Sequence, residues 1–279
     1  MRWIGPSVGL WVAGCVVASP VAAFAGDKPG PAAPKDPEAE PPLEGEAKKQ
    51  YDADFAAYLK QIKGEGNREL VRTHMQQIAT KGRAGRDALI EFARTTSNQA
   101  YIEYAFESLA KIRGRAVREH LTGKYGLRSD DSYVQIVAAK ALGEAKDLKA
   151  IPALLEVVDA KSTKIEVQGA CLIALGKLGK ADTGATEALL RYAETKMDTV
   201  RANALEGLGY LATDYAIKTL KDHLTADKNT RCRGAAALGL GHTLRKDVVP
   251  ALEAALAKDE SMTVKDCISR ALKELGAAK

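Results

Sequence analysis

A leucine that recurs at nearly constant spacing constrains the fold of this 279-residue chain more than any other feature. The leucines are Leu109, Leu142, Leu175, Leu208, Leu240 and Leu272, and the steps between them are 33, 33, 33, 32 and 32 residues. A fixed period of this length indicates a repeat architecture, in which each repeat is one small unit stacked on the next. We therefore expect a stack of repeats rather than a single globular domain.

Each of these leucines closes an apolar stripe with helical spacing. In one repeat, Val134, Val137, Ala138 and Ala141 precede Leu142 at positions that share one face of an α-helix. The centre of each stripe holds small residues, which allow neighbouring helices to approach closely. A glycine directly follows four of the leucines, where it favours the left-handed turn that ends a helix. These glycines are Gly143, Gly176, Gly209 and Gly241.

A second helix is predicted in each repeat by further leucines, twelve to fourteen residues beyond the first: Leu121, Leu154, Leu189, Leu220 and Leu252. Pro152 and Pro250 stand where two of these helices would begin, a position that tolerates a missing N–H. One helix pair cannot bury its own stripe, so neighbouring pairs must stack to complete the core. The sequence predicts an all-α fold, an α-α superhelix (solenoid) of about six helix pairs with a half-repeat as C-terminal cap.

The first 25 residues have the pattern of a secretory signal peptide. Arg2 precedes an uncharged, mostly apolar stretch, and Ala23-Phe24-Ala25 is a small-x-small cleavage site. The same stretch contains Cys15 in a sequence that resembles a bacterial lipobox, and its length can also span a bilayer. Cleavage after Ala25, lipidation at Cys15 and an uncleaved anchor remain three alternatives. We expect the chain to be periplasmic or secreted, or else lipid-anchored to the envelope.

The remaining chain divides into three parts. Residues 26–48 are rich in proline, alanine and glutamate and predict a disordered linker, because they lack the apolar content to fold. Residues 49–65 predict an N-terminal capping helix with one apolar face, and residues 66–279 form the repeat domain. The apolar face of the capping helix consists of Tyr51, Phe55, Tyr58, Leu59 and Ile62.

Two segments of the repeat domain resemble a known family. Residues 198–202 (DTVRA) and residues 134–155, which include Ala141-Leu142-Gly143, look like HEAT-like repeats of the phycocyanobilin-lyase type. The resemblance covers about residues 66–279 and implies a helical solenoid. The resemblance gives almost no indication of activity, because the family includes scaffolds, adaptors, chromophore lyases and a metal-dependent hydroxylase. The residue after the first apolar position of the motif varies between repeats: Arg72, Gln135, Gln168, Arg201, Arg233 and Lys265.

The sequence contains no recognisable catalytic or cofactor site. The histidines His74, His120, His223 and His242 show neither the HExxH spacing nor a following glutamate, so we expect no metal site and no cofactor. Cys171, Cys232 and Cys267 fall on apolar stripes, where a cysteine is typically a small buried side chain. A disulfide between Cys232 and Cys267 and a reactive thiol remain alternatives.

Basic residues cluster in residues 111–128 (KIRGRAVREHLTGKYGLR), a segment that contains six Lys or Arg and only one acidic residue, a Glu. Such a cluster is either a patch that binds an acidic protein or an anionic surface, or a solvated helix surface. Nucleic acid is disfavoured, because export is expected and base-stacking aromatic residues are few. The candidate partner-binding residues, two of them from the preceding repeat, are Arg83, Arg86, Arg113, Arg115, Arg118 and Lys124.

These observations favour a non-catalytic protein-binding scaffold or adaptor of the periplasm or cell envelope. We expect the second helices to line the concave face of the solenoid and to grip a partner protein there. A lyase-like or cofactor-handling enzyme is an alternative that only the resemblance implies. Anionic-ligand binding through residues 111–128 is another. Contact with a membrane is expected only through a lipid anchor at Cys15.

Overall fold

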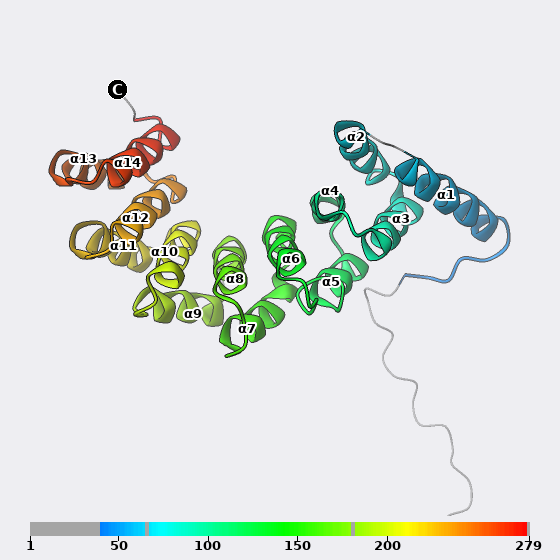
Figure 1. Cartoon of the computed structure of the whole chain (residues 1–279), viewed down its shortest axis with the longest axis horizontal. Helices are drawn as coiled ribbons and strands as arrows, with labels where there is room; N and C mark the ends of the chain where they lie inside the picture. Colours follow the sequence, from blue (N-terminus) through cyan, green and yellow to red (C-terminus); the bar gives the residue numbers. More distant parts are fainter. Residues whose placement is uncertain (1–39, 65–66, 180–181, 278–279) are drawn as a thin grey trace, which may run out of the picture. The chain divides into compact units, whose positions relative to one another are not determined.

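The computed structural model describes residues 40–64, 67–179 and 182–277, and its regular secondary structure in these ranges is entirely helical (Figure 1). Residues 40–279 form one compact unit. The predicted signal segment, with Cys15 and Ala25, and most of the predicted linker lie outside the described residues. None of the helices in the described part of the chain is long and apolar enough to cross a membrane.

Two kinds of helix alternate along the chain after an initial helix, α1 (Gly45–Lys63) (Figure 1). The first helices of the repeats, which carry the leucine anchors, are α2 (Arg68–Ile78), α4 (Gln99–Ile112), α6 (Ser132–Ala145), α8 (Ile165–Leu178), α10 (Asp198–Leu211), α12 (Thr230–His242) and α14 (Met262–Glu274). The second helices are α3 (Gly82–Thr95), α5 (Arg115–Thr122), α7 (Ile151–Asp159), α9 (Thr183–Ala193), α11 (Asp214–Ala226) and α13 (Val249–Lys258). The predicted superhelix of helix pairs, with α14 as a half-repeat cap, is confirmed.

The core of this stack is formed by the residues that the periodicity selects. All six anchor leucines are buried, and so are the five leucines predicted on the second helices. Pro152 and Pro250 lie in the first turns of α7 and α13, as predicted. Each first helix from α4 onward packs along the first helix of the next repeat, whereas second helices contact one another little. The first helices therefore form the more tightly packed of the two layers.

The four glycines after the anchors have a different role from the one we predicted. Gly143, Gly176, Gly209 and Gly241 lie inside their helices and not at left-handed ends. A Cβ on Gly176 would collide with the backbone carbonyl of Gly207 in α10, and one on Gly209 with that of Gly239 in α12. The prediction of helix-ending glycines is therefore wrong, because these residues are needed for close contact between neighbouring first helices.

The boundary between linker and capping helix also needs correction. The helix begins at Gly45, so residues 45–48 of the predicted linker are helical, and it ends at Lys63. This first turn has no apolar side chain to reveal it, but Lys49 forms an ion pair with Glu46 (2.8 Å). Glu40, further into the predicted linker, is also fixed, because its carboxylate binds the guanidinium of Arg86 in α3 (2.9 Å).

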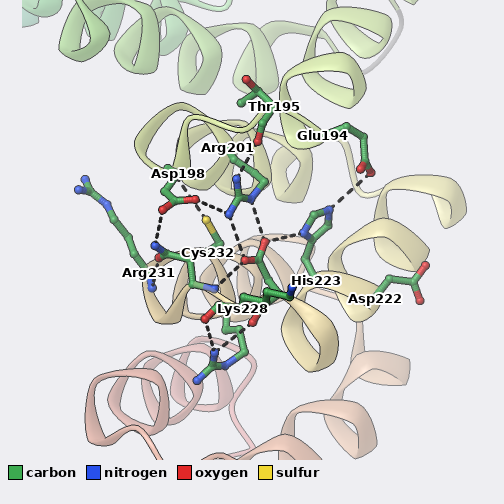
Figure 2. A network of polar contacts seen from close by, with 12 residues as sticks. Glu194, Thr195, Asp198, Arg201, Asp222, His223, Lys228, Arg231 and Cys232 are labelled. Atoms are coloured by element: carbon green, nitrogen blue, oxygen red, sulfur yellow. Dashed lines mark hydrogen bonds and ion pairs between the residues drawn. The ribbon is translucent and has the colours of Figure 1, made fainter.

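A polar network ties the turn before α10 to that helix (Figure 2), and similar hydrogen bonds hold the segments before α6, α8 and α12. In α10, Arg201 donates to the carbonyl of Thr195 (2.7 Å) and binds Asp227 (2.9 Å), which also lies 2.9 Å from His223 Nδ1. Burial alone would raise the pKa of Asp227, but hydrogen bonds from Arg201, the Asn229 backbone and His223 lower it to about 2. The equivalent residues Gln135, Gln168 and Arg233 donate to the carbonyls of Leu127, Val158 and Asp227. In these four repeats, the variable motif position thus fastens the preceding segment to the first helix.

Candidate interaction groove

A groove of about 960 Å³ opens on the layer of first helices. It extends from α2 across α4, α6, α8 and α10 to Arg231 in α12. This groove therefore lies on the other layer from the second helices, on which we expected the binding surface, and the surface that binds a partner stays a prediction. The small residues of the stripes bring the first helices together and leave their solvent-facing positions side by side. The floor is apolar and consists of Ala110, Val137, Ala141, Ala170, Ile173 and Ala174.

Charged side chains surround this floor, and several of them are bound to one another. Arg72 pairs with Glu107 (2.9 Å) and lies over the ring of Tyr104 (5.3 Å to the ring centre). Lys177 pairs with Glu144. Glu103 accepts a hydrogen bond from the Tyr133 hydroxyl (2.8 Å). These contacts leave the groove with fixed walls whose charges are partly neutralised.

A ladder of side chains continues this wall beyond the groove. Glu144, Lys177, Tyr210, His242 and Glu274 each stand two residues after an anchor leucine. The ammonium of Lys177 lies 5.4 Å from the ring centre of Tyr210. The imidazole of His242 stacks on the same tyrosine ring, with 4.5 Å between the ring centres. Burial alone would lower the pKa of His242, but hydrogen bonds and charges from Glu206 and Glu274 outweigh it and raise the pKa. The imidazole is thus held more readily as a cation between two carboxylates.

Four cations of the groove have no ion-pair partner in the part of the chain that the structure describes. Lys111 lies in the last turn of α4, and Arg113 follows directly after that helix. Lys140 lies on α6, and Arg231 lies in the first turn of α12, where its side chain points away from the turn network (Figure 2). All four are exposed. Three of them, Lys111, Arg113 and Lys140, lie on or directly after the two neighbouring first helices α4 and α6.

Comparison with known proteins identifies the architecture. A family model described as HEAT repeats matches residues 124–209 and 186–273, which together cover more than half of the chain. The chain belongs to the HEAT-repeat family. No curated protein sequence is significantly similar to it.

Solved structures similar to this HEAT-repeat chain include the following three. The complex of CpcE and CpcF of phycocyanin lyase from Nostoc sp. PCC7120 is 22% identical, with a TM-score of 0.51, and the match covers 88% of this chain and 92% of that one. Human deoxyhypusine hydroxylase is 15% identical (TM-score 0.37, 82% and 96% covered). The YibA protein of Escherichia coli is 14% identical (TM-score 0.35, 86% and 100% covered). The likeness to the Nostoc protein supports the solenoid fold.

The candidate residues predicted from the sequence do not form one patch on this HEAT-repeat solenoid. Only Arg113 lines the groove, and Lys124 is exposed outside it. Arg83 and Arg86 both bind Glu40, at 3.0 and 2.9 Å. Arg115 and Arg118 are also in ion pairs, with Glu119 and Asp147, at 2.6 Å each. Their role in partner binding stays a prediction, but four of the six charges have acidic partners within the chain.

Lys140, Glu166 and Glu206 line the groove but were not among the predicted residues. Lys140 and Glu206 each stand two residues before an anchor leucine, at the same level of the first helices α6 and α10. That register was available in the sequence.

The three described cysteines of this HEAT-repeat chain lie on first helices, where Cys171 and Cys232 are buried and Cys267 is half-buried. Cys171, Cys232 and Cys267 are free thiols, so the alternative of a Cys232–Cys267 disulfide is not realised in the structure. Burial raises the pKa of Cys171 to about 12 and that of Cys232 to about 11, and it also raises that of Cys267. Among the described residues, no group of three or more His, Cys, Asp or Glu is arranged to hold a metal ion. A buried thiol of high pKa is a poor nucleophile.

Proposed function

We propose that the groove on the first helices binds an extended segment of a partner protein, and that the chain acts as a non-catalytic scaffold. The observation that carries this proposal is the groove itself, an apolar floor between charged walls that runs across the first helices of six successive repeats, from α2 to α12. Solenoids of stacked helix pairs offer such extended surfaces for partner binding. The Nostoc structure is a complex of two proteins, CpcE and CpcF. We propose an association with another protein for this chain too.

Site-specific cross-linking tests this proposal. A photo-reactive phenylalanine analogue at Ile173, on the groove floor, should give a discrete cross-linked product in cells that produce the chain. The matched control carries the same analogue at Lys218, which is exposed on the second helix α11. We expect no discrete product from that position. Equal products from both positions, or none from Ile173, would contradict binding in the groove.

A lyase-like or cofactor-handling enzyme is the second candidate, because the Nostoc structure is part of a phycocyanin lyase. A covalent mechanism of that kind needs a reactive nucleophile, and the raised pKa values of the three described cysteines count against a thiol. Alkylation of the folded chain with iodoacetamide at pH 8 distinguishes the two. We expect all three thiols to react far more slowly than free cysteine. Rapid modification of Cys267, which is only half-buried, would favour the enzyme.

We further propose that the chain is exported, on the strength of its first 25 residues. Mass spectrometry of the protein from an envelope or culture fraction tests this proposal and its alternatives. Cleavage after Ala25 gives an N-terminus at Gly26, whereas lipidation gives a lipid-modified Cys15 as the first residue. An intact N-terminus in a cytosolic fraction would argue against export.

A further inference from the structure

We propose that the partner segment is acidic, and that its carboxylates bind Lys111, Arg113 and Lys140 at one end of the groove. An apolar side chain of the same segment then lies on the neighbouring floor, over Ala170 and Ile173. This inference rests on the proposed function of the groove. It names the chemistry of the segment that the groove receives.

The distribution of bound and unbound charges supports an acidic ligand. The acidic residues at this end of the groove are already engaged, Glu103 by Tyr133, Glu107 by Arg72 and Glu144 by Lys177. The cations Lys111, Arg113 and Lys140 have no ion-pair partner within the described ranges, and all three are exposed. Complementary charge across an interface steers association and selects the partner. The end formed by α4 and α6 therefore offers net positive charge to a ligand.

The backbone of Arg113 gives an independent indication. Its φ and ψ angles are 61° and −171°, a region that is essentially restricted to glycine. The next residue is a glycine, Gly114 (φ 93°), so the turn between α4 and α5 places an arginine in a conformation that glycine would adopt without strain. The Arg113 side chain forms no ion pair with any described residue to compensate for this strain. Residues held in strained conformations concentrate at ligand-binding positions.

The shape of the groove favours a protein segment over a small anion or a nucleic acid. An apolar floor that includes Val137 and Ile173 gains nothing from a phosphate ion, whereas it buries apolar side chains of a peptide. Base stacking needs accessible aromatic faces, and the ring of Tyr210 is already stacked on His242 and faces Lys177. An arginine pairs well with a carboxylate through two parallel hydrogen bonds. Carboxylates next to an apolar residue therefore fit this end best.

Peptide selection on the full-length chain tests the inference. Random twelve-residue peptides displayed on phage are selected, and the winners are labelled with fluorescein and measured by fluorescence anisotropy. Peptides that no longer bind Ile173→Trp, which fills the floor, are counted as groove ligands. We expect these ligands to contain Asp or Glu beside an apolar residue. Arg113→Ala should weaken their binding by about tenfold or more, as expected for loss of a hydrogen bond to a charged group.

Two further variants separate binding from folding. Lys218→Ala removes an exposed cation on α11, outside the groove, and should leave the affinity unchanged. Arg113→Gly removes the side chain and relieves the backbone, so it should lose binding while it remains fully folded by circular dichroism.

Groove ligands that are neutral or basic, or an affinity that Arg113→Ala leaves intact, would overturn the acidic-segment inference but leave the groove as a protein-binding site. If no selected peptide is sensitive to Ile173→Trp, the acidic-segment inference fails. The cross-linking at Ile173 then decides separately whether the groove binds a protein at all. A polyanion such as oligodeoxythymidine that displaces the groove peptides with equal affinity would show that charge alone is recognised, and would also overturn the inference.

Discussion

Arg113 has a strained backbone conformation, and its side chain forms no ion pair with any described residue. A non-glycine residue in this backbone region costs about 1–3 kcal/mol of stability. Glycine would remove this strain, but part of the gain is offset because glycine increases the entropy of the unfolded chain. Arg113→Gly should therefore raise the free energy of unfolding by about 1 kcal/mol. Urea denaturation followed by circular dichroism measures the change. Arg113→Ala is the control, because alanine keeps the Cβ and with it the strain. A stability gain for alanine as large as that for glycine would refute this explanation.

His120 should make the fold sensitive to acid. Its ring is buried against Phe106 and Tyr125, and burial, helped by the charge of Arg94, lowers its pKa to about 4. In the unfolded chain, His120 binds a proton near pH 6.5, whereas in the folded chain it stays neutral until the pH is much lower. Stability is therefore present above pH 6.5 and is lost as the pH falls toward 4, by about 2–3 kcal/mol.

Urea midpoints at pH 7 and pH 4 check this prediction. Acidic groups such as Asp227, whose pKa is lowered, also lose stability in acid, so the wild-type chain must be compared with His120→Phe. Phenylalanine keeps the aromatic packing but cannot be protonated. The loss between the two pH values should be smaller in His120→Phe, and parallel losses in both proteins would show that His120 does not contribute.

The sequence predicts residues well where identity alone decides their environment. The anchor leucines and Cys171 are buried as expected, because an apolar side chain on a periodic stripe has only one favourable place. Ion pairs are a different case. Glu40 lies 46 residues before Arg86, and nothing local in either segment indicates that they meet. The positive patch expected at Arg83 and Arg86 was therefore overestimated, since the charges that neutralise it come from distant positions.

At the scale of helices, the contact between neighbouring first helices depends on glycine. A Cβ at residue 176 would lie well inside van der Waals contact with the carbonyl of Gly207, so Gly176→Ala must push α8 away from α10. Overpacking of this kind costs about 1–3 kcal/mol or more, and we expect the upper end because the obstacle is backbone. Urea denaturation measures the loss. In the matched control, Gly184→Ala in α9, the nearest atoms lie at 3.3 Å or beyond, and alanine should be neutral or stabilise the helix by about 0.5–1 kcal/mol.

The elements themselves were predictable, but the roles of their small residues were not. A glycine after a leucine fits both a helix end and a close helix contact, and the sequence pattern does not distinguish the two. The structure shows that other residues end these helices, with Lys146 (φ 54°) after α6 and Ala212 (φ 53°) after α10 in the left-handed region. The layer that these glycine contacts pack tightly is also the one on which the groove opens.

At the scale of the whole stack, the repeat length places equivalent positions of successive first helices at the same level. This is why Glu144, Lys177 and Tyr210 meet, although they come from three different repeats. Once the layer is known, the sequence is sufficient to list the residues at each level of the groove. The sequence does not identify the partner, because the groove combines side chains whose pairing is fixed only in three dimensions.

The stack should also respond locally when one of its contacts is disturbed. In a solenoid each repeat contacts only its neighbours, so stability is close to a sum of nearest-neighbour terms. Gly209→Ala forces α10 and α12 apart, because its Cβ would collide with the backbone of Gly239. Hydrogen–deuterium exchange read by mass spectrometry should therefore quicken in α10 and α12, less in α8 and α14, and remain unchanged in α4. Faster exchange of equal size in every helix would instead mean that the stack opens as one cooperative unit.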